Sequence, residues 1–150
     1  MSAPADILPA GPDDLDGIVG LLMAQLAEHD IDTSRSGVER AVAGALADPG
    51  RAQIFVARRD GVLVGVAYVS FIWALEHAGL SAWLEELYVV PSERQRGIGG
   101  LLLDAALAFA RDAGCAAVDL EVETAHARAE NLYARAGFRR HTRARWVKPL

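Results

Sequence analysis

The fold is decided by the stretch Glu85-Glu86-Leu87-Tyr88-Val89-Val90-Pro91-Ser92-Glu93-Arg94-Gln95-Arg96-Gly97-Ile98-Gly99-Gly100. Its first half predicts a strand, because residues 87–90 form an apolar run of β-formers and Pro91 then removes a ladder donor. Three glycines follow, and residues 101–110 form an apolar run rich in helix formers. A strand, a glycine turn and a helix start gather free backbone N–H groups, so the stretch predicts a phosphate-binding loop.

The glycine spacing separates this loop from two other phosphate loops. No Gly-Lys-Ser/Thr ends it, and Arg94-x-x-Gly97-x-Gly99 is not the Gly-x-Gly-x-x-Gly of dinucleotide sites. The stretch resembles the pyrophosphate loop of the GCN5-related N-acetyltransferases, in which Gln/Arg-x-x-Gly-x-Gly/Ala holds acetyl-coenzyme A. The alternative is a glycine-rich connection that binds nothing.

A second motif extends the resemblance. The turn Tyr133-Ala134-Arg135-Ala136-Gly137-Phe138 is similar to the family's Tyr-x-x-x-Gly-Phe signature. Leu84-Glu85-Glu86-Leu87-Tyr88-Val89 is most similar to the branch that includes diamine (spermidine/spermine) acetyltransferases. The resemblance covers nearly the whole chain. It implies one α/β (α+β) domain over residues 1–150, with a mixed central sheet of about six to seven strands flanked by about four helices.

The chain in order predicts a mixed pattern of strands and helices. Ser36 and Glu39 predict a capping box at the start of the second helix. Asp60-Gly61 predicts a hairpin turn, Gly65 a bulge, and Gly137 a helix C-cap. The predicted strands are residues 7–8, 53–59, 62–73, 81–90, 117–122 and 143–148, and the predicted helices are residues 14–28, 36–48, 100–113 and 126–136.

Composition excludes several functional classes. With 52% hydrophobic and 23% charged residues, the chain is globular, and its net charge of −5 argues against nucleic acid as the main partner. No apolar run is long enough to cross a bilayer and no signal pattern opens the chain, so we expect a cytoplasmic protein with no membrane partner. The histidines His29, His77, His126 and His141 have no ligand spacing, so no metal is predicted.

The resemblance implies that acetyl-coenzyme A is the co-substrate and places its contacts. The pantetheine arm would run beside the strand and pair with main-chain groups of residues 87–89, one of which would polarise the thioester carbonyl. Arg94 and Arg96 offer charged donors to phosphate, or are solvated loop charges. His126 stands where many relatives carry an asparagine that touches the cofactor. The expected contacts are Leu87, Tyr88, Val89, Arg94, Gln95, Arg96, Gly97, Ile98, Gly99, Gly100 and His126.

Acetyl transfer to an amine also needs a base, because an alkyl ammonium has a pKa near 10.4 and only the neutral amine attacks. Glu85 and Glu86 are adjacent on a strand, so we expect their side chains on opposite faces, with at least one in a wet cleft. By its match to the diamine branch, Glu85 would be the base and Glu86 a contact for a cationic acceptor. The alternative is that both are strand-end surface charges.

The leaving thiolate needs a proton, and the resemblance places the hydroxyl of Tyr133 near the sulfur. Its reference pKa of about 10 lies above that of a thiol, so we expect Tyr133 to be the catalytic acid. The alternative is an ordinary packing tyrosine. Cys115, the single cysteine, lies outside the motif strand, which argues against an acetyl-cysteine route.

The acceptor pocket is the least defined part of the prediction. The polar run Glu28-His29-Asp30 is expected to contact the acceptor, together with Trp73 and Trp83, unless the tryptophans are core or dimer surface. The predicted reaction is transfer of an acetyl group to a primary amine of a small molecule, a polyamine among the candidates, by direct attack. Alternatives are a protein α-amine or lysine, an aminoglycoside or an amino acid as acceptor, or a non-catalytic coenzyme A sensor. A homodimer is left open.

Overall fold

The computed structural model describes residues 3–123 and 126–150, and its strands form one sheet in the order β1-β2-β3-β4-β5. The first three pairs are antiparallel and β4 pairs with β5 in parallel, which makes the sheet mixed. In chain order the elements are β1 (Asp6–Pro9), α1 (Leu15–Glu28), α2 (Arg35–Ala47), β2 (Ala52–Arg59), β3 (Val62–Ala74), β4 (Gly79–Val89), α3 (Ile98–Asp112), β5 (Ala117–Leu120) and α4 (Ala127–Arg135).

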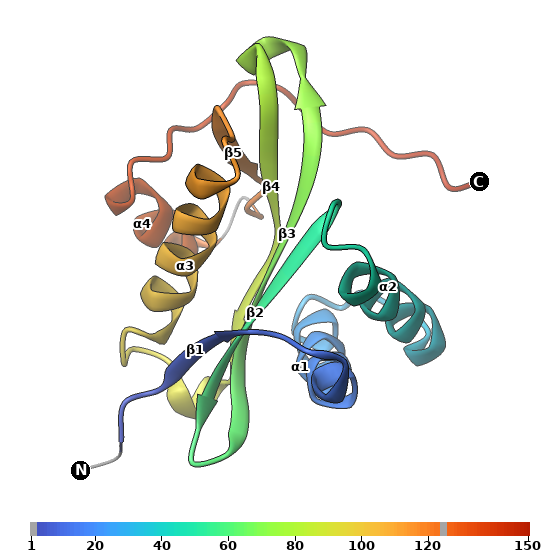
Figure 1. The fold of residues 1–150 in the computed structure, drawn as a ribbon, viewed down its shortest axis with the longest axis vertical. Coiled ribbons are helices and arrows are strands. Elements are labelled where there is room, and N and C mark those ends of the chain that lie inside the picture. Colours follow the sequence, from blue (N-terminus) through green and yellow to red (C-terminus); the bar gives the residue numbers. More distant parts are fainter. Residues whose placement is uncertain (1–2, 124–125) are drawn as a thin grey trace.

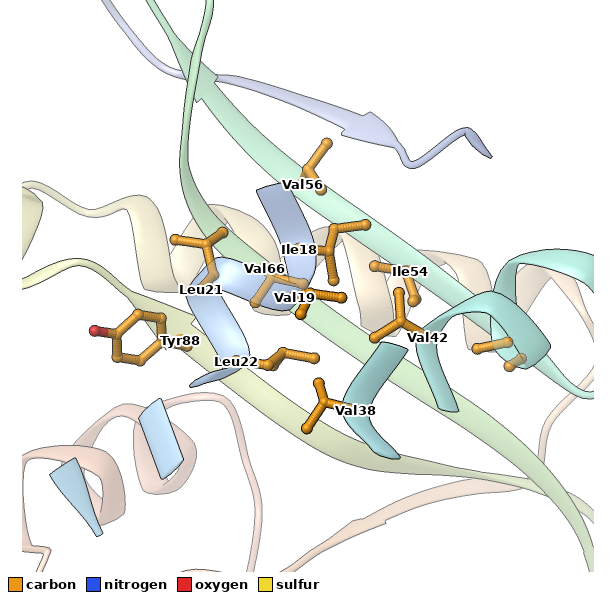
Figure 2. Close-up of a cluster of buried hydrophobic side chains, with 12 residues drawn as sticks. Ile18, Val19, Leu21, Leu22, Val38, Val42, Ile54, Val56, Val66 and Tyr88 are labelled. Atoms are coloured by element: carbon orange, nitrogen blue, oxygen red, sulfur yellow. The ribbon is translucent and has the colours of Figure 1, made fainter. Parts of the chain in front are cut away.

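The helices cover both faces of the sheet, with α1 and α2 on one side and α3 and α4 on the other (Figure 1). Each face has its own apolar cluster. Figure 2 shows the cluster under α1 and α2, where Ile18 and Val19 are fully buried against Val66 of β3. The cluster under α3 contains Leu84, Leu102 and Leu103. Burying apolar side chains on both faces fixes the sheet between the two helical layers.

Local signals in the sequence position most of these elements. The turn between β2 and β3 has the positive φ angles expected of Asp60-Gly61, at 49° and 79°. The register shifts between Ala57 and Arg58, opposite Gly65, so the bulge predicted there is confirmed. A Cβ on Gly65 would lie 2.9 Å from Leu102 and 3.0 Å from the carbonyl oxygen of Tyr88, which explains the glycine. Gly137, at φ 93°, follows the end of α4.

Two predictions about these elements are wrong. The described residues form a five-stranded sheet, and residues 143–148 are not a strand, because they pair with none of its five strands. The second helix is capped by Ser34 rather than by a box of Ser36 and Glu39. Ser34 has the extended backbone of an N-cap, and its Oγ accepts a 3.1 Å hydrogen bond from the N–H of Gly37.

Candidate active site

The site begins where β4 and β5 part. Their parallel pairing runs from Ser81 and Ala117 to Leu84 and Leu120, whereas β4 continues to Val89. The N–H of Val90 donates to Val64 of β3 at 2.9 Å, so alternation turns the main-chain groups of Leu87 and Val89 the other way, into the gap. The gap therefore offers strand donors and acceptors to a ligand.

Tyr88 differs from its two neighbours. Its carbonyl oxygen points toward Gly65 of β3, and its ring is buried in the cluster of α1. Its hydroxyl, which points away from the cluster in Figure 2, donates to Oε1 of Glu28 at 3.0 Å. The structure therefore directs both the main chain and the side chain of Tyr88 away from the gap, against the prediction of a cofactor contact.

The glycine loop closes one end of the gap with unpaired donors. Gln95 and Gly97 have positive φ angles of 62° and 81°, and Gly97 is the N-cap of α3. Within the described part of the chain, none of the N–H groups of residues 95–100 has an acceptor. A Cβ on Gly99 would come no closer than 3.8 Å to Leu132 and 4.0 Å to Val89, so its side is open. Consecutive free N–H groups at the start of a 15-residue helix form an anion site.

Arg94 fastens this loop to the protein. Its Nε donates to the carbonyl of Val89 at 2.9 Å, and its Nη2 donates to both carboxylate oxygens of Glu28 at 2.9 and 2.8 Å. Burial raises the pKa of Glu28, but its bonds to Arg94 and Tyr88 outweigh this and leave the pKa below its usual value. Arg94 thus joins β4, the loop and α1, and Arg96, about half exposed, is the freer of the two loop arginines.

A β-bulge places both glutamates on one side of the sheet. Tyr68 of β3 pairs with Glu86 and Val69 pairs with Leu84, so Glu85 is the extra residue. Leu84 and Leu87 both pack into the cluster under α3, which turns the two residues between them toward the side of α1 and α2. The prediction that the adjacent glutamates point to opposite faces is therefore wrong, since it assumed a regular strand.

The two carboxylates have different surroundings. Glu86 is half-buried, and the pKa of its carboxyl group is raised above the usual value. Burial is the largest cause, and the charge of Glu85 raises the pKa further. A hydrogen bond from Gln25 and the charge of His29 act in the opposite direction but do not cancel the rise. Glu85 is exposed, and its Oε1 accepts a 2.6 Å hydrogen bond from Ser70. Burial and the charges of both glutamates also raise the pKa of Tyr68. Of the two carboxylates, Glu86 is therefore the less exposed to solvent.

Tyr133 of α4 lies within the electrostatic reach of Glu86. Burial, and secondarily the charge of Glu86, raises the pKa of Tyr133 to about 12. Its ring meets Phe138 edge-on at 5.7 Å between centroids, which fixes the ring across the turn at the end of α4. The hydroxyl therefore stays protonated at neutral pH. Transfer of its proton to a thiolate, with a thiol pKa of about 8.5, would be uphill by about 5 kcal/mol, which favours a hydrogen-bond donor over a full acid.

The polar residues at the C-terminal end of α1 face the start of α4. Nδ1 of His29 lies 3.2 Å from Glu123, and the His29 ring is 6.1 Å from that of His126. His126 is the N-cap of α4, and its Nδ1 accepts from the N–H of Ala129 at 3.4 Å. A neutral ring bonded in this way carries its proton on Nε2, where it can donate. Asp30 is exposed at φ 54°.

A small pocket extends from Glu86 between α1, α2 and the sheet. Its volume is about 140 Å³, and Gln25, Tyr68 and Glu86 are its polar members. The other lining side chains are apolar: Leu22, Leu26, Val38, Ala41, Val42 and Ile54. The sequence did not single out Gln25, Tyr68, Ser70 or Glu123, because each comes from an element distant in sequence and only the fold brings it to the two glutamates.

Three other predicted features can be placed. Trp73 is largely exposed near the tip of the β3–β4 hairpin, while Trp83 is partly buried. Cys115 lies between α3 and β5, and burial raises its pKa, which keeps it a thiol. Among the described residues, no group of histidine, cysteine and carboxylate side chains is arranged to hold a metal ion, and no helix is long and apolar enough to cross a membrane.

Known proteins with similar sequences are acetyltransferases. The chain is 33% identical over 119 residues to the aminoglycoside N(6')-acetyltransferase type 1 of Klebsiella aerogenes, covering 77% of this chain and 78% of that protein. It is 30% identical over 152 residues to the aminoalkylphosphonate N-acetyltransferase of Salmonella typhimurium, covering 97% and 95%. Against the streptothricin acetyltransferase of Streptomyces lavendulae, 37% identical over 101 residues and 63% of this chain, the match spans 49% of that protein.

Solved structures agree on the fold. The aminoglycoside N-acetyltransferase AAC(6')-Iy in complex with CoA superposes with a TM-score of 0.83 at 21% identity, covering 99% of this chain and 96% of that one. The sequence also matches the acetyltransferase (GNAT) family over residues 20–138, a span that contains the glycine loop, both glutamates and Tyr133. The chain belongs to the acetyltransferase (GNAT) family and is an acyltransferase enzyme.

Proposed function

We propose that this enzyme transfers the acetyl group of acetyl-coenzyme A to a primary amine of a small, cationic, aliphatic molecule by direct attack. The observation that carries the proposal is the meeting of three features in one gap. These are the unpaired N–H groups of residues 95–100, the main chain of Leu87 with the N–H of Val89, and the pair Glu86 and Tyr133.

The residues present fit acetyl-coenzyme A. The donors of the glycine loop suit a pyrophosphate, and the charge of Arg96 lies beside them. The main-chain groups of Leu87 and the N–H of Val89 can pair with the amide-bearing pantetheine arm, as an added strand would, while the Val89 carbonyl is held by Arg94. Nε2 of His126 is a further donor at the start of α4. Acetyl-coenzyme A would supply an activated thioester. Arg94 contributes to its binding by holding the glycine loop against β4 and Glu28.

We assign deprotonation of the acceptor to Glu86 and contact with a second cationic group of the acceptor to Glu85. These assignments reverse the roles that the family resemblance implies for the two glutamates. Three observations support the exchange: Glu86 is half-buried, its pKa is raised toward the working range of a base, and its charge reaches Tyr133. Glu85 instead points into solvent beside Ser70, where it suits the distant ammonium of a longer acceptor. Glu86 first takes one proton from the ammonium, and the neutral amine nitrogen then attacks the thioester carbon. The carbon–sulfur bond breaks with Tyr133 donating a hydrogen bond to the sulfur, and the second proton of the nitrogen passes to the leaving thiolate, which departs as a thiol.

The walls of the site support a thin, cationic acceptor. Glu85, Glu86 and Glu123 contribute negative charge near the gap, which attracts an ammonium and repels an anionic group such as a phosphonate. The 140 Å³ pocket beside Glu86 lies below the 300–1,000 Å³ common for drug-sized ligands, so an alkyl chain fits and a sugar ring stays outside. These features favour a di- or polyamine over an aminoglycoside, an aminoalkylphosphonate or a protein amine.

A panel of acceptors assayed by thiol release from acetyl-coenzyme A tests the proposal. We expect kcat/KM to be highest for aliphatic di- and polyamines, lower for monoamines and aminoglycosides, and lowest for aminoalkylphosphonates. A preference for aminoglycosides would overturn the acceptor class and leave the reaction intact. Tight binding of acetyl-coenzyme A without turnover of any amine in the panel would favour the non-catalytic sensor.

A further inference from the structure

The two arginines that end β2 take different partners. Arg58 pairs with Asp14, just before α1, and Arg59 pairs with Glu93, which lies between β4 and α3. Successive side chains of a strand point to opposite faces, so adjacent arginines meet different neighbours. Figure 1 shows the β2–β3 turn and the segment between β4 and α3 at the same end of the molecule. The end of β2 therefore contacts the segment that leads into the glycine loop.

The ion pair of Arg59 and Glu93 is nearly enclosed by the protein. Their side chains are 11% and 18% exposed, and Nη1 of Arg59 lies 2.7 Å from Oε2 of Glu93. Within the described residues, that Oε2 and the Nε of Arg59 are buried without a well-aligned hydrogen bond. Charge therefore holds the pair more than directed hydrogen bonds do. A buried charge needs an opposite charge beside it, so each of the two depends on the other.

Glu93 also lies near a second arginine. Nη1 of Arg96 is 3.7 Å from the same Oε2, and the Arg96 side chain is 48% exposed. Attraction between charges weakens with distance and with exposure to water. Glu93 is therefore balanced mainly by the closer and more buried Arg59. Arg96 keeps most of its charge for another anion.

The glycine loop supplies the place for that anion. In the described part of the chain, the N–H groups of residues 95–100 have no acceptor, and Arg96 lies among them. The charge of Arg94, by contrast, is already balanced by the carboxylate of Glu28. An unbalanced carboxylate at Glu93 would repel a phosphate bound to these N–H groups. The affinity of the loop for phosphate thus depends on how well Glu93 is neutralised.

We propose that Arg59 and Glu93 are positioning residues for the phosphate groups of coenzyme A, with Arg59 balancing Glu93 so that Arg96 can turn to the phosphates. The proposal rests on the binding of coenzyme A at the glycine loop and does not depend on which amine is acetylated. Arg59 acts through Glu93 and touches no atom of the cofactor. A pair that only braced the loop would weaken cofactor binding whichever partner was removed.

Calorimetry with coenzyme A on two single variants separates charge balance from bracing. Arg59→Gln leaves Glu93 unbalanced, so Arg96 is drawn to it, and we expect the Kd to rise by at least about fivefold. Glu93→Gln removes the negative charge and releases Arg96, so the Kd should fall by about two- to fivefold. The double variant has neither charge, and its Kd should lie within about twofold of the wild type.

Two further variants control for stability. Arg59→Lys keeps the charge and should bind coenzyme A as the wild type does, even where its melting temperature is lower. Arg58→Gln breaks the neighbouring ion pair with Asp14 and should lower the melting temperature without changing the Kd. Dephospho-coenzyme A, which lacks the 3′-phosphate, identifies the group that Arg96 meets. The loss in Arg59→Gln persists with this ligand for a contact to the pyrophosphate and disappears for a contact to the 3′-phosphate, and either result supports the proposal.

Three results would overturn the proposal. Weaker binding in both single variants would reduce the pair to a brace, and an unchanged Kd in Arg59→Gln would remove it from cofactor binding. Weaker binding in Glu93→Gln alone would have the same meaning if Arg59→Gln did not fold. All three leave the acetyl-transfer proposal intact, whereas a wild type that does not bind coenzyme A would overturn both.

Discussion

At the scale of single residues, Glu86 is placed for chemistry at a cost in stability. Its raised pKa means that the folded chain holds the proton more tightly than the unfolded chain, whose reference value is 4.5. Stability is therefore lost as pH rises from the unfolded-state pKa through the folded-state pKa, and the cost is fully present at neutral pH. Sites that need a strained or desolvated group commonly trade stability for activity.

Glu86→Gln should therefore raise the melting temperature at pH 7 while kcat/KM falls by roughly 10²- to 10⁴-fold. Thermal melts between pH 3.5 and 8 should show that the gain shrinks below about pH 4, where Glu86 is protonated in both states. Glu85→Gln is the matched control, and because Glu85 is exposed its melting temperature should change little. A larger loss of kcat in the control would return the base to Glu85.

Tyr133→Phe keeps the ring and its packing on Phe138 and removes only the hydroxyl. We expect kcat to fall by about ten- to a thousand-fold with little change in the affinity for acetyl-coenzyme A. Because the pKa of Tyr133 is about 12, the wild-type pH–rate profile should show no loss of an acid below about pH 10. An unchanged kcat in the variant would remove Tyr133 from the mechanism.

At the scale of elements, the sequence predicted the glycine loop because its signal is local. The apolar β-forming run, Pro91 and the glycines can all be recognised in the sequence without knowledge of the fold. The bulge at Glu85 depends on the register with Tyr68 and Val69 of β3, which no local pattern records, so the opposite-face prediction was wrong. The strand predicted at 143–148 has the right pattern but pairs with none of the five strands, since strands are completed by contacts distant in sequence.

Gly99→Val tests the loop as an element. A Cβ at this position meets only ordinary contacts at 3.8 and 4.0 Å, so the chain should fold, while the branched side chain would keep a pyrophosphate from the N–H groups. We expect the wild type to bind acetyl-coenzyme A with a micromolar Kd, which corresponds to a binding free energy of roughly 8 kcal/mol. Calorimetry should show that the Kd of the variant is at least about tenfold higher. Gly44→Val in α2 makes the same change at an open position and should bind normally. Equal affinity in both variants would contradict the loop assignment.

At the scale of the whole molecule, the acidic gap should distinguish acceptors by charge. Raising the ionic strength from about 0.01 to about 0.15 M shortens the screening length from about 30 to about 8 Å, so a distant ammonium near Glu85 loses most attraction. We expect KM for a polyamine to rise several-fold and KM for a monoamine to rise less than about twofold. Glu85→Gln should reduce the salt dependence for the polyamine, whereas Asp104→Asn on the exposed side of α3 should not. Identical salt effects on both acceptors would show that a second charge on the acceptor is not recognised.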